Sequence, residues 1–286
     1  MSSDMGGVDN SLCLEGGARM GGAAKKLHSD AEPLVSIVTV VFNDVANLQR
    51  TIDSIASQTY QNIEHIVIDG GSTDGTLDII RRNSSIDYWV SERDCGIYDA
   101  MNKGVRHASG AWINFMNSGD VFFDRVTVKS VFLNLDIQES DLIYGDVEVD
   151  YGVFKKINKA GPVSSLKTGM QFSHQSLFAR RSILEEQGFD LSYRTAADYN
   201  FIFLCWVSGC QFIGIDLVVS SVSSGGISDV QRLKSLEQRA QIVERSVGLS
   251  AADRAVFVME RLRIRLTSLL KRLLPPRWID YVRKKK

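Results

Sequence analysis

Three short apolar runs of the sequence each lead into a polar side chain, and this pattern restricts the fold more than any other feature. The runs cover residues 34–41, 63–68 and 112–116. The polar residues that follow them are Asn43, Asp69 and Asp120. The first run reads LVSIVTVV, which is typical of a strand covered on both faces. Such strands build an open α/β sheet, in which ligands bind at the edge formed by the carboxyl ends of the strands. We therefore predict a site there.

The stretch from Asp94 to Asp120 predicts one helix followed by one strand. Its apolar residues recur at helical spacing, at Ile97, Met101, Val105 and Ala108. Ser109 and Gly110 stop that helix, and the strand at 112–116 runs directly into Asn-Ser-Gly-Asp. These four residue types also favour an ordinary turn, so a structural reading of Asp120 stays open beside the functional one.

Composition and charge restrict the class of protein. The chain has 286 residues, of which 44% are hydrophobic and 23% charged, and these values are ordinary for a globular protein. Its four cysteines show no CxxC spacing, which argues against a zinc site or a disulfide framework. Residues 259–286 hold ten Lys/Arg against two acidic residues. Because the net charge is -1, the rest of the chain carries -9, and nucleic acid is not expected as its ligand.

The sequence divides into three parts. Residues 1–32 are punctuated by glycine pairs and are expected to be disordered. Residues 33–229 are expected to form one α/β domain, with a first half at about 33–121 and a second at about 122–229. Residues 230–286 predict a basic helical tail. No apolar run approaches the roughly 20 residues that span a bilayer.

The second half of the domain is less regular in pattern. A strand is expected at 142–149 and a hairpin around Gly152. Residues 196–207 predict a helix with Asp198 in its first turn. Two strands are expected next, at 211–215 and 217–222.

Six sequence blocks follow one another in a specific order. They read PLVSIVTVVFND, IEHIVIDGGSTDGT, GIYDAMNKG, GAWINFMNSGD, HQSLFARR and AADYNF. Together they resemble the family 2 inverting glycosyltransferases of bacterial polysaccharide synthesis, and most of all the branch that serves colanic acid and related exopolysaccharides. The resemblance covers about residues 34–228. It implies a GT-A fold, with a mostly parallel central sheet and helices on both faces. It also implies a nucleotide-diphosphate sugar donor and a divalent metal, Mg²⁺ or Mn²⁺.

The resemblance assigns roles to nine residues. Those on the nucleotide-sugar side are Val40, Asn43, Asp69, Asp94, Asn102, Lys103 and His174. Val40 and Asn43 would line the base and ribose pocket, and Asp69 would bond the nucleobase. Asp94 also matches a nucleotide-side position. Asn102 and Lys103 would approach the diphosphate. Asp120 matches the last acid of the metal motif, and Asp198 matches the catalytic base.

Two positions depart from the family pattern. The metal motif usually reads Asp-x-Asp-Asp, whereas this chain has Asn-Ser-Gly-Asp at 117–120, with one carboxylate. The acidic pair before the base helix is Ala197-Asp198, so the first acid is missing and the second is kept. The resemblance therefore implies an intact base and a reduced metal motif.

The chemistry gives each acidic residue a functional and a structural reading. Charge builds on the leaving diphosphate, and a cation held by Asp120 would neutralise it. The acceptor hydroxyl needs a general base, which Asp198 would supply, although a carboxylate in the first turn also stabilises a helix. Asp69 either accepts from the nucleobase or caps the next turn. Lys103 is either a diphosphate contact or a solvated helix lysine. His174 either contacts acceptor, phosphate or metal, or bonds structurally.

The tail also has two readings. Residues 262–273 carry a leucine stripe opposed by arginines, which predicts an amphipathic helix on an anionic membrane surface. The alternative is a helix packed on the domain or on a second subunit. We expect a cytoplasmic protein, peripheral on the cytoplasmic face of the inner membrane, that is a possible homo-oligomer. Its donor would be a UDP- or GDP-sugar and its acceptor a saccharide or lipid-linked oligosaccharide.

Two competing classes of protein complete the set of hypotheses. A non-catalytic sugar-nucleotide-binding or scaffold protein of the same fold is compatible with the reduced metal motif. A Rossmann dehydrogenase is disfavoured, because Phe42-Asn43-Asp44-Val45 follows the first strand where that fold needs GxGxxG.

Overall fold

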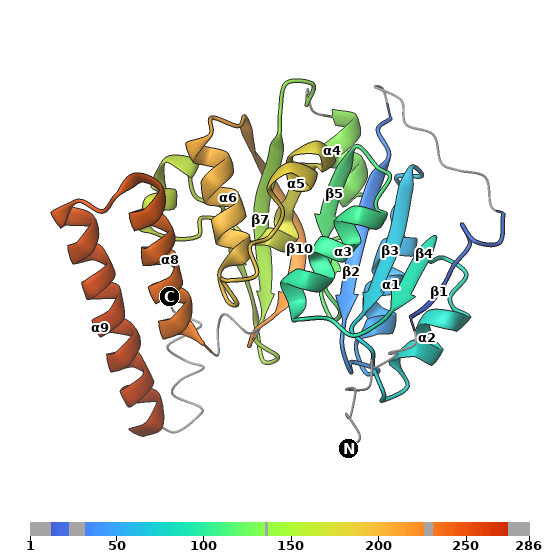
Figure 1. Cartoon of the computed structure of the whole chain (residues 1–286), viewed down its shortest axis with the longest axis horizontal. Coiled ribbons are helices and arrows are strands. Elements are labelled where there is room, and N and C mark those ends of the chain that lie inside the picture. Colours follow the sequence, from blue (N-terminus) through green and yellow to red (C-terminus); the bar gives the residue numbers. More distant parts are fainter. Residues whose placement is uncertain (1–12, 23–31, 135–136, 226–230, 274–286) are drawn as a thin grey trace, which may run out of the picture.

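The computed structural model describes residues 13–22, 32–134, 137–225 and 231–273. Its centre is a ten-stranded sheet with the order β1-β4-β3-β2-β5-β9-β7-β10-β6, and β8 pairs with β7 off this path. Figure 1 shows β1 towards one end of the molecule, with α8 and α9 beyond α6 at the other end. The sheet is mostly parallel and carries helices on both faces, as the sequence predicts.

The first half of the sheet is a parallel βα array. Its elements are β2 (Val35–Val41), α1 (Leu48–Ala56), β3 (Ile63–Asp69), α2 (Thr76–Arg82), β4 (Tyr88–Ser91), α3 (Ile97–His107) and β5 (Trp112–Phe115). Strand β2 pairs in parallel with both β3 and β5, and β3 pairs in parallel with β4. Every residue of β2 and β3 is buried, so their apolar residues are not confined to alternate positions, and buried polar residues such as Ser36 and Glu64 are hydrogen-bonded.

The second half of the chain extends the same sheet. Its elements are β6 (Val121–Phe122), α4 (Thr127–Asn134), β7 (Leu142–Asp150), β8 (Lys155–Asn158), η1 (Val163–Thr168), η2 (His174–Ser176), β9 (Leu177–Arg180), α5 (Arg181–Gln187), α6 (Ala197–Val207) and β10 (Phe212–Ser223). Strand β9 is antiparallel to its neighbours β5 and β7. The hairpin predicted around Gly152 is confirmed, because β7 and β8 pair antiparallel across it.

The prediction of two strands between residues 211 and 222 is wrong. Residues 212–223 form one strand, β10, that pairs in parallel with β7. The register shifts between Gly214 and Val218 and again between Val218 and Ser220. An irregularity of this kind keeps a strand in its sheet while it breaks the alternation of side chains, so the sequence reads as an interruption.

Alternate residues of each buried strand serve opposite faces of the sheet. Val38 and Val40 pack in a cluster with residues of α3, α5 and α6. Val35 and Ile37 pack on the other face in a cluster with residues of α1 and α4. Because both faces are covered, the carboxyl edge is where side chains of several strands are free to converge.

The N-terminal segment is not wholly disordered, which corrects the prediction for residues 1–32. Residues 14–16 form β1 (Leu14–Gly16), which pairs antiparallel with β4 at the edge of the sheet. Arg19 holds this segment in place, because its Nη1 lies 2.7 Å from Glu64 Oε1 and donates to the backbone oxygen of His107. A short edge strand needs few apolar residues, so composition does not reveal it.

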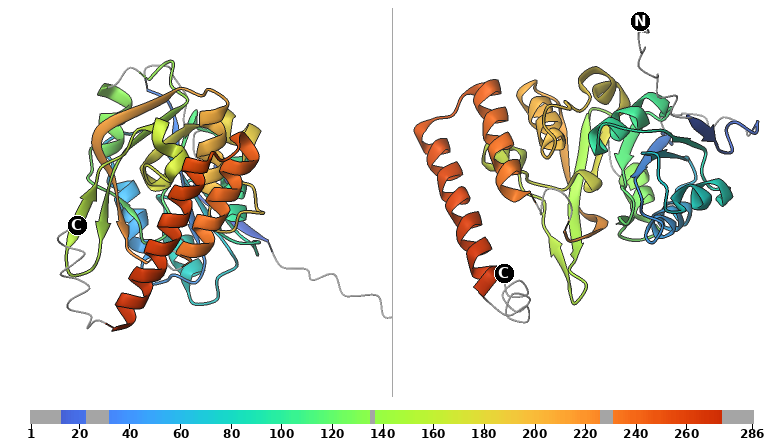
Figure 2. Two further views of the ribbon diagram at one scale, coloured as in Figure 1. Left: turned by 90° about the vertical axis from the view of Figure 1, so that its left-hand side faces the viewer. Right: turned by 60° about the horizontal axis from the view of Figure 1, so that its bottom comes forward.

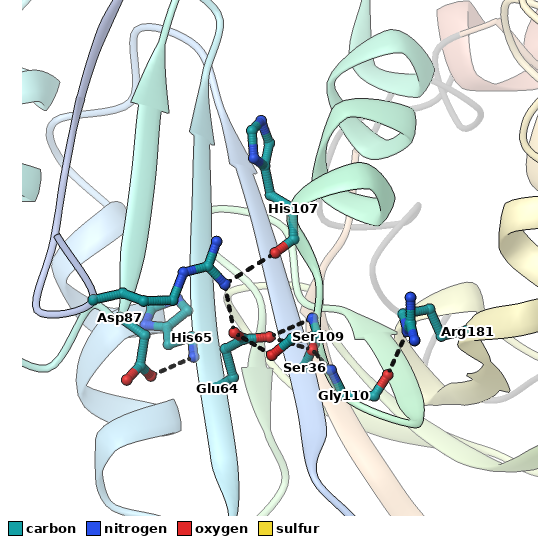
Figure 3. A network of polar contacts seen from close by, with 9 residues as sticks. Ser36, Glu64, His65, Asp87, His107, Ser109, Gly110 and Arg181 are labelled. Atoms are coloured by element: carbon teal, nitrogen blue, oxygen red, sulfur yellow. Dashed lines mark hydrogen bonds and ion pairs between the residues drawn. The ribbon is translucent and has the colours of Figure 1, made fainter. Parts of the chain in front are cut away.

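Glu64 is a buried carboxylate at the start of β3, at the opposite end of the strand from Asp69 (Figure 3). The hydroxyls of Ser36 and Ser109 and the amide of Ser109 donate to it, at 2.6 to 2.8 Å. Burial alone would raise the pKa of Glu64, but these hydrogen bonds and the charge of Arg19 hold it below its usual value. The group ties three chain segments together away from the predicted site.

The helical tail is confirmed for the residues that the structure describes. Helix α8 (Arg232–Val247) packs against α6, and α9 (Ala251–Leu273) packs against α8 and η1. Both views in Figure 2 show α9 outermost. Within the described part of the chain, no helix combines the length and the apolarity that crossing a membrane requires.

Candidate active site

A cavity of about 810 Å³ opens at the carboxyl edge of the sheet. Its lining comes from the loop after β5, the segment that includes η2, the start of α6, the loop after β10, and one side of α8 and α9. Asp120, His174 and Asp198 all line it. The sequence predicted one common cavity for Asp69, Asp120 and Asp198. Asp120 and Asp198 do line this cavity, but Asp69 does not.

Asp120 is held by a tight turn after β5. Gly119 has a φ of 88°, a conformation that favours glycine, and its amide donates to Thr51 Oγ1 at 2.9 Å. The Thr51 hydroxyl in turn donates to the backbone oxygen of Asp120 at 2.8 Å. Gln175 Nε2 donates to Asp120 Oδ2 at 2.8 Å. Burial raises the pKa of Asp120, because it disfavours the ionised form of the carboxylate.

Asp198 lies in the first turn of α6 and is buried at the base of the cavity. Its Oδ1 accepts from the Tyr98 hydroxyl at 2.9 Å and from the Tyr199 amide at 2.8 Å. Its Oδ2 lies 3.1 Å from Nδ1 of His174. Burial alone would raise the pKa of Asp198, but His174 and the two other donors hold it below its usual range. Asp198 is therefore ionised at neutral pH.

His174 is fixed between Asp198 and Asn117, whose Nδ2 lies 3.1 Å from His174 Nε2. Two arrangements satisfy this contact. In one, a neutral imidazole accepts from the amide of Asn117. In the other, an imidazolium donates to Asn117 Oδ1, which otherwise has no hydrogen-bond partner among the described residues. In both, the proton on Nδ1 is donated to Asp198.

Two consecutive residues of η2 therefore reach the two carboxylates. His174 contacts Asp198, and Gln175 contacts Asp120. The sequence placed His174 near the site but did not identify its bond to Asp198, and it missed the role of Gln175. The available signal was the His-Gln pair that opens the HQSLFARR block.

The residues around Asp120 fit a divalent cation held mainly by non-protein ligands. Among the described residues, no group of three or more His, Cys, Asp or Glu could hold a metal. Asp120 Oδ1 and Oδ2 accept one hydrogen bond each, so each keeps a lone pair for a cation. Mg²⁺ retains several waters and is often bound by one or two carboxylates together with substrate phosphates. One carboxylate is thus compatible with a metal that arrives with the donor.

A model of the family described as glycosyl transferase family 2 matches residues 36–197, which is more than half of the chain. The chain belongs to glycosyl transferase family 2. The PGL/p-HBAD biosynthesis glycosyltransferase of Mycobacterium tuberculosis is 35% identical to it over 207 residues, which cover 70% of this chain and 80% of the relative. The assignment confirms the family resemblance, while the link to the colanic acid branch stays a prediction.

Solved glycosyltransferases share the GT-A fold of this chain. The mannosyltransferase PcManGT from Pyrobaculum calidifontis, in complex with GDP-Man and Mn²⁺, has a TM-score of 0.59 at 18% identity. The match covers 80% of this chain and 69% of that one. Residues 1–349 of S. aureus TarS, in complex with UDP, have a TM-score of 0.58 at 15% identity. That match covers 80% of this chain and 70% of TarS 1–349.

Of the residues predicted on the nucleotide-sugar side, His174 lines the cavity and the other six do not. Asp69 is fully buried, and its carboxylate accepts from the amide and hydroxyl of Ser72 and from the hydroxyl of Ser91. It therefore caps the turn after β3, the structural alternative that the sequence left open. Val40 packs in the core, so its side chain offers no pocket surface.

Asn43 and Asp94 lie nearer the surface of this edge. Asn43 has a φ of 48°, which asparagine tolerates better than most residues, and its Oδ1 accepts from the amide of Thr73. Asp94 lies beside Gly70, where an added Cβ would come 2.5 Å from its Oδ2. The neighbouring Phe42 ring is 63% exposed. Sequence reasoning did not select Phe42, although an aromatic residue directly after a buried strand was the signal.

Asn102 and Lys103 do not line the cavity. Asn102 exchanges two hydrogen bonds of 2.8 Å with the backbone of Phe189, so it fastens α3 to the segment after α5. Lys103 is buried, with Nζ 2.8 Å from Glu92 Oε1 and 2.7 Å from the backbone oxygen of Arg93. It is therefore neither the solvated helix lysine considered from the sequence nor a free cation facing the cavity.

Arg239 on α8 is a cavity residue that sequence reasoning missed. Its Nε is buried without a hydrogen-bond partner, and no hydrogen bond or ion pair joins Arg239 to any residue that the structure describes. Figure 1 places α8 beyond α6, on the side away from β2 and β3. The charges of Glu260 and Asp198 act on Arg239, and its guanidinium keeps hydrogen-bond donors that an anionic ligand could use.

Proposed function

We propose that this protein is a metal-dependent inverting glycosyltransferase that moves a sugar from a UDP- or GDP-sugar to an acceptor hydroxyl. One observation carries the proposal. The ionised carboxylate of Asp198 and the buried carboxylate of Asp120 line the same cavity, and consecutive residues of η2 hold both. Inversion requires a base on one face of the sugar and charge stabilisation of the leaving group on the other, and two separate carboxylates supply these functions.

Asp198 acts as the base in this proposal. It accepts the proton of the acceptor hydroxyl while that oxygen bonds to the anomeric carbon and the bond from that carbon to the diphosphate oxygen breaks. His174 is a positioning residue, because it contacts Asp198 and keeps its pKa low. A low pKa makes a weaker base but ensures that the carboxylate is ionised when the acceptor arrives.

Asp120 would hold the divalent cation, Mg²⁺ or Mn²⁺. When bound, such a cation neutralises the charge that develops on the diphosphate oxygens. Burial raises the pKa of Asp120, and a cation beside the carboxylate would favour its ionised form. Gln175 orients the carboxylate through its hydrogen bond to Oδ2.

The nucleoside is proposed to lie along the edge near Asn43 and Asp94, with the exposed ring of Phe42 available for stacking on the base. The complexes of TarS with UDP and of PcManGT with GDP-Man support a uridine or guanosine donor. Val40 would contribute through its backbone only, since its side chain lies in the core. Recognition of the nucleobase by Asp69 stays a prediction. It requires the Asp69 carboxylate to give up its hydrogen bonds from Ser72 and Ser91 and to accept from the nucleobase instead.

The acceptor is proposed to enter on the side of α8 and to carry an anionic group. Arg239 makes no hydrogen bond or ion pair with the described residues, and a phosphate or carboxylate of the acceptor would accept from its guanidinium. A lipid-phosphate-linked saccharide has this chemistry. Bacterial polysaccharide synthesis, a cytoplasmic location and a homo-oligomer stay predictions.

The test is nucleoside diphosphate release from UDP- and GDP-sugars, measured with and without Mn²⁺ and with a panel of acceptors. Asp198→Asn should lower kcat by about 10² to 10⁴-fold while donor binding, followed by thermal shift, is kept. Asp216→Asn is the matched control, because Asp216 is exposed on β10 and pairs with Lys159. Product stereochemistry by NMR tests inversion, and a product that retains the donor configuration would refute it.

The competing scaffold hypothesis predicts a different result from the same experiment. Donor binding without release of nucleoside diphosphate, across all donors and acceptors, would replace the enzyme with a non-catalytic binder. The intact contact between His174 and Asp198 favours the enzyme, because a protein that only binds the donor has no use for a positioned base.

A further inference from the structure

Helix α9 has two faces of opposite function. One face packs inward, where Phe257 is buried and where Glu260 and Ile264 line the cavity. The other face is apolar and exposed, and we call it the outer face of α9. It consists of Val258, Met259, Leu262, Leu266 and Leu269, which are 55% to 69% exposed. Their spacing of three or four residues places them in one continuous stripe along the helix.

The charges on α9 are arranged for an anionic surface. Arg254, Arg261 and Arg265 recur at intervals of seven and four residues, so they follow one edge of the outer face. Arg265 has no partner among the described residues. Arg254 and Arg261 form exposed pairs with glutamates of α8, and exposed pairs of this kind are weak. The single acidic residue between positions 254 and 273 is Glu260, which faces the cavity.

We propose that the outer face of α9 lies on an anionic lipid surface, with its apolar side chains in the headgroup region and its arginines at the lipid phosphates. An amphipathic helix with these properties binds in the plane of the interface. A second copy of the chain is a poorer occupant, because two such faces would oppose their arginine edges, whereas lipid phosphates neutralise them. Residues 274–286 lie outside the described residues, and their sequence adds Arg277, Trp278, Tyr281 and four consecutive cations at 283–286.

This placement brings the catalytic cavity close to the lipid. The same helix supplies the outer face and part of the cavity wall, so about one helix diameter, roughly 10 Å, separates them. If the proposed transfer is correct, an acceptor whose saccharide is linked to lipid would reach Asp198 while its lipid stays in the membrane. The membrane contact itself does not depend on that transfer.

The experiment is vesicle flotation of the full-length chain. Wild type should float with phosphatidylcholine vesicles that contain phosphatidylglycerol and much less with phosphatidylcholine alone. Leu262→Glu/Leu266→Glu should lower the bound fraction at least about tenfold, because it places two carboxylates where two leucines would be buried. Val153→Glu/Ile157→Glu is the matched control, since both residues are exposed in the β7–β8 hairpin. This control should float like wild type.

Three results would overturn the proposal. They are failure of wild type to float, equal flotation of the α9 variant, and, in sedimentation without lipid, a dimer that the α9 variant dissociates. The melting temperature verifies that each variant folds. Nucleoside diphosphate release from a soluble donor should be unchanged in the α9 variant, because neither leucine lines the cavity. Flotation and turnover are thus separate readouts, so a failed transferase assay leaves the flotation result intact.

Discussion

Replacing His174 tests the coupling between the proposed base and its positioning residue. His174→Ala removes the largest contribution that lowers the pKa of Asp198, while the burial that raises this pKa stays in place. The pKa of Asp198 should therefore rise. A base works only when ionised, so activity is lost as the pH falls through its pKa. The acidic limb of the pH profile of kcat should accordingly move to higher pH.

The magnitude follows from the contact that is removed. A hydrogen bond to a charged group contributes about 1.5–3 kcal/mol, a factor of about 10 to 150, and this is the largest loss of kcat expected when Asp198 is no longer positioned by the bond. Asn117 also loses its partner on the far side of the ring, which adds disorder to the loop that precedes Asp120. KM for the donor should change less than kcat, because Asp120 keeps its bond from Gln175.

A conservative variant separates the hydrogen bond from the ring. The amide nitrogen of asparagine occupies about the position of Nδ1, so His174→Asn should restore part of the loss at high pH. His107→Gln is the matched control, since His107 ends α3 far from the cavity. Stopped assays of nucleoside diphosphate release across pH give both profiles. An acidic limb in His174→Ala that coincides with wild type, or lies at lower pH, would refute the reasoning.

Two further predictions concern other buried charges. Glu64→Gln should destabilise the fold by about 2–4 kcal/mol at neutral pH, against about 0–1 kcal/mol for the exposed Glu185→Gln, as measured by urea unfolding. The pKa of Glu64 is lower in the folded than in the unfolded protein, so its contribution to the free energy of unfolding is complete above the unfolded pKa. That contribution disappears as the pH falls through the folded pKa. A difference in unfolding free energy between wild type and Glu64→Gln that persists in acid would contradict this assignment. Arg239→Met should raise KM for an anionic acceptor about tenfold or more while thermal stability changes little, because no hydrogen bond or ion pair joins Arg239 to the described residues. A large loss of stability with unchanged KM would instead make Arg239 structural.

The sequence predicted best the strands in which every residue is buried. Strands β2 and β3 are buried on both faces, so most of their residues are apolar, and the apolar runs in the sequence indicated where both strands lie. Strand β10 could not, because its register shifts place an exposed residue, Asp216, inside a strand. Strand β1 was missed because a short edge strand draws its order from pairing with β4, which no local pattern records.

The candidate site shows the same division. Motif resemblance located Asp120, His174 and Asp198, and the cavity joins them. It did not reveal that Asn102 and Lys103 are committed to Phe189, Glu92 and Arg93. A polar side chain has the same letter in the sequence whether it binds substrate or backbone. Whether its donors and acceptors remain available for a substrate depends on neighbours that are distant in the chain.

By itself, the sequence determined the class of the fold, the family and the carboxylates on which the proposed chemistry depends. These follow from local periodicity and from residue types that the reaction cannot replace. Tertiary structure alone decided that η2 holds both carboxylates and that Arg239 lines the cavity without a hydrogen bond to the described residues. It also decided that α9 presents one face to the cavity and an apolar face to the outside. Each of these depends on packing between segments far apart in the chain, and packing is a property of the assembled surfaces rather than of any one stretch of residues.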